Sequence, residues 1–272
     1  MSTGNNIING LWIGNTLSSL ELITINSFIA NGHTFRLWTY EPIKTLLPQG
    51  VIIADAAEII PASHIFRYKY NNQFGHGKNS LAGFSDLFRY KLLYEKGGWW
   101  VDMDVTCLKP FDFEAEYVFR NHHKLLMVGN IMKCPQGSEL MLLCYEEAKG
   151  QVNAENRDWM LPITILNNNI LKLNLEKYII ELSNKDSWYD IRNFFRRKLN
   201  APNHWYALHW NNEELGRNAV NKAVHVANSL YGELIKKYSI ENLLLTGVDT
   251  VKYRFKLSLT FFVVNYFYKR FL

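Results

Sequence analysis

The sequence predicts an α/β fold with a largely parallel sheet, and three observations support it. Short apolar runs alternate with helix signals in the N-terminal part, which is typical of strand–helix–strand units. Hydrophobic residues make up 48% of the 272 residues and charged residues 20%, as in folded chains with a sizeable core. No internal repeat or linker rich in Pro, Gly or Ser divides the chain, so we expect one domain over residues 1–250 and a distinct segment over 251–272.

The expected elements of the first half follow from apolar runs and from helix end signals. Ser18 and Glu21 have the spacing of a capping box and predict a helix that ends at Asn31–Gly32. A second helix is expected from Ser80 to Lys96, ended by Gly97 and Gly98. Strands are expected at Ile7–Ile13, His33–Tyr40, Val51–Ala54 and Trp99–Val105.

The second half has weaker patterns. Helices are expected over Ser138–Lys149 and Glu213–Lys237. Leu161–Leu175 is apolar with an Asn-rich middle. Arg192–Leu199 is a basic stretch, and Asn203–Trp210 gathers aromatic and histidine residues. These patterns predict an elaborated second half rather than another domain.

The cysteines and the chain ends bear on the cellular compartment. Cys107, Cys134 and Cys144 form no CxxC pair, so neither a disulfide framework nor a zinc site is expected. The N-terminus lacks the basic and apolar regions of a secretory signal. The apolar run Leu259–Val264 is far shorter than the ~20 residues of a spanning helix. We therefore expect a cytoplasmic protein.

The net charge of +5 resides in the C-terminal segment. Residues 251–272 hold five basic residues, eight aromatic residues and no acidic residue, so the remainder, with 25 charges of each sign, is neutral. Such interleaving is typical of nucleic-acid binding or of an anionic membrane surface. Because the only other basic cluster is that near Arg192, the membrane surface is favoured and no nucleic-acid partner is expected. A core-packed helix with basic ends remains the alternative.

The stretch that carries chemistry is Ser85–Asp104, with the pattern SDxxRYxxLYxxGGxxxDxD. Aspartates two apart on a strand face the same side. At the C-terminal end of a strand, where α/β sheets bind ligands, Asp102 and Asp104 could share one Mg²⁺ or Mn²⁺ and through it a diphosphate.

The neighbours of the two aspartates follow the same parity. Trp100 shares the parity of Asp102 and is expected to flank the same cleft, with Trp99, Val101 and Met103 toward the core. Asp86 and Arg89 share one helix face, and alone this i,i+3 pair is an ordinary salt bridge.

The composite motif resembles the DXD-containing enzymes of glycosyltransferase family 32. That family is similar to yeast initiating mannosyltransferases, to the glucosylating domain of large clostridial toxins, and to bacterial capsule and O-antigen enzymes. The resemblance extends to five further segments: IINGLWIGN at 7–15, FRLWTYE at 35–41, VIIADAAEIIP at 51–61, GNIMKCPQGS at 129–138 and ALHW at 207–210.

The resemblance implies a GT-A fold, in which a Rossmann-like nucleotide-binding sheet merges with an acceptor-binding half. It implies transfer of a sugar from a nucleoside diphosphate sugar, with UDP favoured, to a hydroxyl of a glycan or of an undecaprenyl-diphosphate-linked acceptor. Retention of configuration and a place in bacterial surface polysaccharide synthesis are further implications. The basic aromatic segment 251–272 would then hold the enzyme on the inner face of the cytoplasmic membrane.

The resemblance also implies roles for individual residues. Asp104, Asp102 and His209 would hold Mn²⁺ or Mg²⁺, and Asp102, Asp104 and Arg89 would be catalytic. The donor would be bound by Trp12, Ile13, Gly14, Asp86, Arg89, Trp100, Asp102, Asn130 and Trp210.

Two other functions fit parts of the sequence. Residues 102–106 have the pattern DxDxT of haloacid-dehalogenase-type phosphatases, in which Asp102 would be a nucleophile and Asp104 an acid/base. No acidic pair follows downstream, as such phosphatases need, so we rank this alternative lower. The other alternative is a non-catalytic sugar-binding relative.

Overall fold

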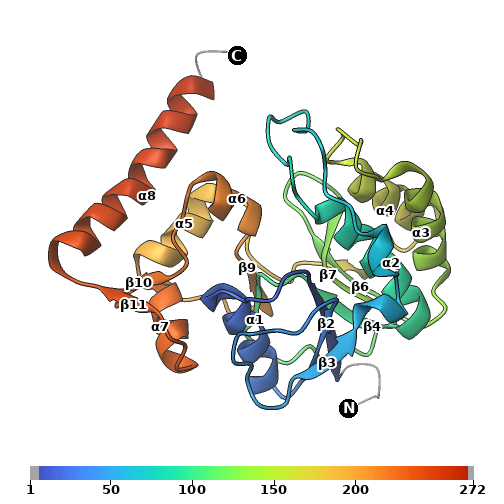
Figure 1. Cartoon of the computed structure of the whole chain (residues 1–272), viewed down its shortest axis with the longest axis horizontal. Helices are drawn as coiled ribbons and strands as arrows, with labels where there is room; N and C mark the ends of the chain where they lie inside the picture. Colours follow the sequence, from blue (N-terminus) through green and yellow to red (C-terminus); the bar gives the residue numbers. More distant parts are fainter. Residues whose placement is uncertain (1–5, 269–272) are drawn as a thin grey trace.

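The structure is a computed structural model that describes residues 6–268, with side chains described through residue 258. Its centre is a seven-stranded sheet of order β3-β2-β1-β4-β7-β6-β8 (Figure 1). The strands are β1 (Ile7–Trp12), β2 (Thr34–Thr39), β3 (Ile52–Asp55), β4 (Gly98–Val101), β6 (Val118–Asn121), β7 (Met127–Cys134) and β8 (Ile179–Ile180).

The sheet is mostly parallel. Strands β1 to β4 run in one direction, β7 is antiparallel to both β4 and β6, and β8 is parallel to β6. The expected α/β class is therefore confirmed, and it is the class that the resemblance to GT-A enzymes implies.

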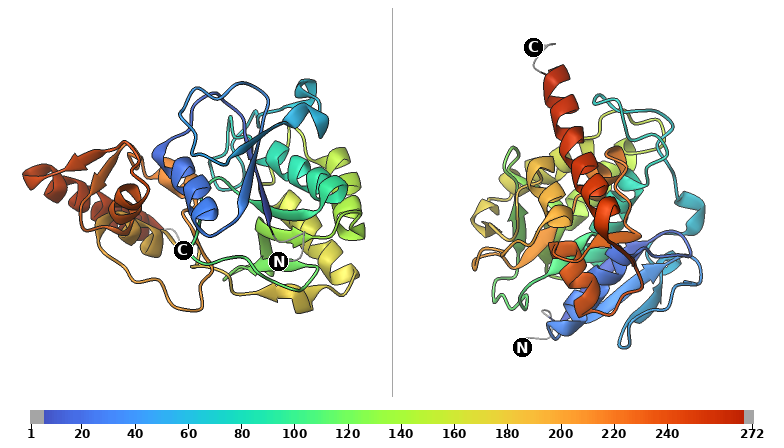
Figure 2. Two further views of the ribbon diagram at one scale, coloured as in Figure 1. Left: turned by 90° about the horizontal axis from the view of Figure 1, so that it is seen from below. Right: turned by 90° about the vertical axis from the view of Figure 1, so that its left-hand side faces the viewer.

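Helices cover both faces of the sheet. Helix α1 (Ser19–Ala30) lies on one face, and α2 (Ala82–Lys96), α3 (Glu139–Gln151) and α4 (Leu161–Lys172) lie on the other. The left view of Figure 2 shows α1 and α2 on opposite sides of β1. Because neighbouring strand residues face opposite sides, Trp99 joins the apolar cluster under α1 and Trp100 joins the cluster under α2.

Helix α1 begins after Ser18 and ends before Asn31, as the sequence predicts, and α2 begins one residue later than predicted. The Ser18 side chain accepts from the Leu20 N–H, and the Glu21 carboxylate accepts from the Ser18 N–H, which confirms the capping box. In α2 the N-cap position belongs to Leu81, while the Ser80 hydroxyl accepts from the Ala82 N–H.

The strand predicted at Trp99–Val105 is interrupted. Strand β4 ends at Val101, residues 102–104 form a turn, and β5 (Val105–Cys107) leaves the main sheet. Its partner is β9 (Ala207–His209), in an antiparallel pair that matches Val105 with His209. The two aspartates therefore lie in a turn between two sheets rather than on one continuous strand.

The helix predicted over Glu213–Lys237 is wrong. That range holds α6 (Asn212–Arg217), β10 (Val224–Val226) and α7 (Leu230–Lys237), and β10 pairs with β11 (Leu243–Leu245). Helix α6 cannot continue because Ala219 has a left-handed φ of 47°. Ser229 starts α7 by accepting from the Gly232 N–H. Helix α5 (Trp188–Arg196) and three 3₁₀ turns at Ala56–Glu58, Ala62–His64 and Glu176–Tyr178 complete the elements before α8.

Helix α8 (Gly247–Tyr268) extends away from the body (Figures 1 and 2). Tyr253 and Leu257 pack on a third apolar cluster, formed mainly by α1, α5 and α7. Val248, Val251 and Phe255 are 68%, 66% and 62% exposed. Side chains from residue 259 onward, which include most aromatics of the basic segment, lie outside the described residues. Within residues 6–268, no helix is long and apolar enough to span a membrane.

Candidate active site

An open pocket of about 730 Å³ lies beside the turn that carries the two aspartates. It brings together residues from segments far apart in the sequence. Its lining includes Trp12, Ile13, Asp86, Arg89, Asp102, Asp104, Asn130, Asp186 and His209. All of these except Asp186 are predicted site residues, whereas the predicted donor-binding residues Gly14, Trp100 and Trp210 are absent from the lining.

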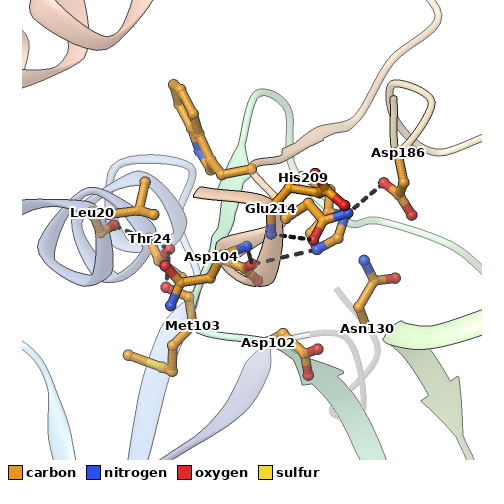
Figure 3. A network of polar contacts seen from close by, with 12 residues as sticks. Leu20, Thr24, Asp102, Met103, Asp104, Asn130, Asp186, His209 and Glu214 are labelled. Atoms are coloured by element: carbon orange, nitrogen blue, oxygen red, sulfur yellow. Dashed lines mark hydrogen bonds and ion pairs between the residues drawn. The ribbon is translucent and has the colours of Figure 1, made fainter. Parts of the chain in front are cut away.

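The backbone of the DXD turn is fixed from three directions. The Asp102 N–H donates to the Asn130 carbonyl of β7 at 2.9 Å. The Thr24 hydroxyl of α1 donates to the Met103 carbonyl at 2.9 Å, and the Trp210 N–H donates to the Asp104 carbonyl at 3.0 Å. Figure 3 shows Thr24 beside Met103. The packing of the fold therefore sets where both carboxylates point.

One guanidinium serves two carboxylates on one side of the pocket. Arg89 Nη2 lies 3.0 Å from Asp102 Oδ1 and 3.3 Å from Asp86 Oδ1. Burial raises the pKa of Asp86 to about 6, because it outweighs the opposing attraction of Arg89 and adds to the repulsion from Asp102. Burial likewise raises the pKa of Asp102.

The other side of the pocket is richer in positive groups. His209 Nε2 lies 3.4 Å from Asp104 Oδ2, and the Asn212 N–H donates to the same oxygen at 2.6 Å. Burial would raise the pKa of Asp104, but His209 and this N–H outweigh it and hold the pKa below its usual value. Burial would lower the pKa of His209, yet Asp186 and Asp104 raise it to about 10.

Asp186 and Arg120 are site residues that the sequence did not reveal. His209 Nδ1 lies 2.6 Å from Asp186 Oδ1. Figure 3 draws the two side chains facing each other. Arg120 holds both oxygens of Asp186, at 2.7 and 2.9 Å. The sequence does offer one signal for this pair. Arg120 follows apolar residues in β6, and a charged residue in a buried strand needs a partner of opposite charge.

Two predicted donor-binding tryptophans are core residues instead. Trp100 lies under α2 against Phe88, and its ring lies 5.3 Å from the guanidinium carbon of Arg89. Its Nε1–H donates to Asp102 Oδ1 at 2.7 Å. The expectation that its ring flanks the cleft is wrong, because the strand alternation turns the ring to the α2 face. Trp210 is fully buried in the third cluster, and its Nε1–H donates to the Thr106 hydroxyl at 2.8 Å.

The predicted residues of the first strand meet the pocket only in part. Trp12 and Ile13 line it, and the Trp12 Nε1–H is bound to the Thr16 carbonyl at 3.0 Å. Gly14 has a φ of 132° and forms the turn after them without reaching the lining. This conformation favours glycine, so Gly14 shapes the path of the chain beside the pocket.

The donor set fits a divalent cation chemically. Two carboxylates and one imidazole suit Mn²⁺ or Mg²⁺, and the low pKa of Asp104 keeps one carboxylate ionised. In this arrangement, within the described part of the chain, no three His, Cys, Asp or Glu side chains converge as a metal-binding group. Two buried pocket donors, Asn130 Nδ2 and Arg89 Nε, have no hydrogen-bond partner in the protein. They are therefore available to oxygen atoms of a ligand.

Comparison with known proteins assigns the class of this site. Residues 39–121 match the family described as the glycosyltransferase sugar-binding region containing a DXD motif. The matched range holds Asp86, Arg89, Asp102 and Asp104. The protein is a glycosyltransferase, and residues 39–121 are similar to the DXD-containing sugar-binding region.

Two solved structures are among those similar to the chain. The PaToxG glycosyltransferase is 14% identical, with 64% of this chain and 73% of that chain covered and a TM-score of 0.42. A transferase mutant is 9% identical, with 62% and 85% covered and a TM-score of 0.44. No curated protein matches the chain.

Proposed function

We propose that this glycosyltransferase moves a sugar from a nucleoside diphosphate sugar, with UDP favoured, to a hydroxyl of a glycan or lipid-linked acceptor. The observation that carries the proposal is the meeting of the DXD turn, Arg89, Asn130 and His209 in one pocket. Their resemblance to family 32 enzymes supports the choice of a metal-dependent, retaining reaction in bacterial surface polysaccharide synthesis, such as capsule or O-antigen assembly.

The residues divide the work by their chemistry. Asp102, Asp104 and His209 hold Mn²⁺ or Mg²⁺, which when bound neutralises the departing diphosphate. The free Nε–H of Arg89 serves a phosphate oxygen, since a guanidinium binds phosphate well. Asn130 Nδ2 donates to a sugar hydroxyl. The ring of Trp12, which lines the pocket, stacks on the base.

Hydrolysis of the glycosidase type fits the site poorly. That chemistry places two carboxylates across the bond that breaks, whereas Asp102 and Asp104 extend from one short turn. Phosphatase chemistry fits poorly as well, because the Thr106 of the DxDxT pattern is fully buried and its hydroxyl accepts from Trp210. Sugar transfer remains the function that uses the pocket as a whole.

The decisive experiment is calorimetric binding of UDP, GDP, CMP and ADP, each with and without Mn²⁺. One diphosphate is expected to bind tightly, only with Mn²⁺, and an Asp102→Asn/Asp104→Asn double variant is expected to lose that binding. Asp112→Asn, which changes an exposed aspartate after β5, is the matched control. Absence of nucleotide binding under all conditions would contradict the proposal and direct the work to phosphatase assays. Turnover with an acceptor would exclude a non-catalytic relative.

The acceptor side of the proposal involves the membrane. Val248, Val251 and Phe255 follow the three–four spacing of one helical stripe on α8, and all are exposed. With the exposed Lys252 nearby, this stripe fits an anionic membrane surface on the cytoplasmic side, where an undecaprenyl-diphosphate-linked acceptor would lie. Val251→Glu/Phe255→Glu is expected to abolish binding to anionic vesicles. Undiminished binding would show that this stripe is not the anchor.

A further inference from the structure

The side chain of Asp186 is placed to act on His209 rather than on a ligand. Asp186 lies in the loop after β8, and its side chain is only 9% exposed. Its Oδ1 faces His209 Nδ1 at 2.6 Å and Arg120 Nη2 at 2.7 Å, while Oδ2 accepts from Arg120 Nη1 at 2.9 Å. Both carboxylate oxygens are therefore engaged by protein groups.

The Arg120 side chain that binds Asp186 is itself held in place by other hydrogen bonds. It is 1% exposed, and its remaining donors are also bound: Nε donates to the Ser183 hydroxyl and Nη2 to the Asn184 carbonyl, both at 2.5 Å. A guanidinium held at this many points offers its carboxylate partner one orientation. Asp186 is thus fixed before any ligand arrives.

The backbone of His209 is fixed by the same loop. Asn184 Oδ1 accepts from the His209 N–H at 2.8 Å, and Asn184 Nδ2 donates to the His209 carbonyl at 2.9 Å. Pairing of β9 with β5 places His209 opposite Val105, directly after the DXD turn. With the backbone set and Nδ1 bound to Asp186, the remaining nitrogen, Nε2, faces Asp104 (Figure 3).

Arg120 also contacts a second residue of the pocket lining, Asn130. Its Nη1 lies 3.4 Å from Asn130 Oδ1, which leaves the Nδ2 donor of Asn130 buried and without a protein partner. One buried arginine thus orients an imidazole through Asp186 and an amide directly.

We propose that Asp186, held by Arg120, is a positioning residue that fixes the His209 ring so that Nε2 is presented beside Asp104 as a metal-binding nitrogen. The inference rests on the proposed function, because it assumes that His209 is a metal ligand. A carboxylate that accepts from the second nitrogen of a ligating histidine sets the ring orientation, and its removal typically weakens metal binding by 10- to 100-fold.

A double-mutant cycle on the full chain tests this, with free Mn²⁺ measured by electron paramagnetic resonance in the presence of UDP. Asp186→Asn is expected to weaken Mn²⁺ binding by about 10- to 100-fold. In a His209→Gln background the same substitution is expected to change the affinity less than about twofold, because its effect passes through His209. Asp112→Asn is the control and should bind Mn²⁺ as the wild type does.

The outcomes separate the inference from the function on which it rests. A wild type that binds no Mn²⁺ contradicts the proposed metal site, and the inference with it. A wild type that binds Mn²⁺ beside an Asp186→Asn protein of equal affinity contradicts the inference alone. Equal losses in the two backgrounds would make Asp186 a direct ligand, which also overturns it.

A second measurement needs no variant and so does not depend on whether Asp186→Asn folds. In ¹⁵N-histidine-labelled wild type, His209 Nδ1 is expected to keep its proton when Mg²⁺ and UDP are added, while the Nε2 resonance shifts. Loss of the Nδ1 proton, or a shift at Nδ1 with Nε2 unchanged, would reverse the assigned roles of the two nitrogens and overturn the proposal.

Discussion

The two sides of the pocket differ in how many positive groups face the buried carboxylates. On the Arg89 side, one guanidinium lies between Asp86 and Asp102. On the His209 side, His209 faces both Asp104 and Asp186, and the guanidinium of Arg120 also binds Asp186. The side chains of Asp86 and Asp102 are 14% and 30% exposed, more than the 10% and 9% of Asp104 and Asp186. Burial alone would therefore raise the pKa values more on the His209 side, so the count of counter-charges decides the outcome. The pKa values of Asp86 and Asp102 are raised, and those of Asp104 and Asp186 are lowered.

This difference shows that the DXD spacing does not make its two aspartates equivalent. The turn lies at the boundary between two sheets, so Asp102 meets residues of α2 and β4 and Asp104 meets β9 and the start of α6. Asp104 stays an anion and is the stronger attraction for a cation. Asp102 is bound by Arg89 and Trp100, and a ligand must compete with both.

The largest effect is expected from removing a counter-charge on the His209 side. Arg120→Met leaves Asp186 buried with only His209 and His122 within ion-pair distance. Breaking a buried ion pair from one side costs about 3–5 kcal/mol. Urea unfolding measures the loss. Lys149→Met, which breaks an exposed pair on α3, is the control and should lose under about 1 kcal/mol. Equal losses would mean that Asp186 does not depend on Arg120.

A smaller, pH-dependent effect is expected on the Arg89 side. Because the pKa of Asp86 is raised to about 6, its contribution to stability is present at low pH and is lost as the pH rises from about 4 through 6. Relative to Asp86→Asn, the wild type should therefore lose up to about 3 kcal/mol of unfolding free energy over that range. Urea unfolding at a series of pH values measures the difference. A difference that stays constant with pH would show that Arg89 keeps Asp86 ionised throughout.

The sequence predicted the first half of the fold better than the second. Capping residues and glycines set helix ends through local contacts, so α1 and the end of α2 at Gly97 followed from neighbouring residues. The break between β4 and β5 depends on the pairing of β5 with β9, about a hundred residues later. The alternation of inward and outward residues along a strand does not indicate which distant strand it pairs with. The breaks between α6 and α7 depend similarly on backbone conformation at Ala219.

The candidate site divides in the same way. Asp86, Arg89, Asp102 and Asp104 share one local motif, and the structure brings all four to the pocket. Asp186 belongs to no motif, and its position follows from the tertiary contact with Arg120. Trp210 was predicted to bind the donor because it follows His209 in the segment ALHW. Consecutive residues of an extended chain face opposite sides, however, and the Trp210 ring packs in the third apolar cluster.

The smallest effect is expected where the two sides meet across the pocket. His76 lines the pocket from the loop before α2, the helix that carries Arg89. Its Nδ1 is 2.9 Å from Glu213 Oε1 of α6, the helix whose first residue binds Asp104. A half-exposed pair of this kind is worth under about 1 kcal/mol, so His76→Gln should barely change urea unfolding. If the pair holds the mouth of the pocket, the same energy limits the increase in the UDP dissociation rate to about fivefold. Stopped-flow release of UDP with Mn²⁺, compared with Lys149→Met, measures it. An unchanged UDP dissociation rate would show that the His76–Glu213 pair does not hold the mouth of the pocket. An increase beyond tenfold would mean that His76 contacts the nucleotide itself.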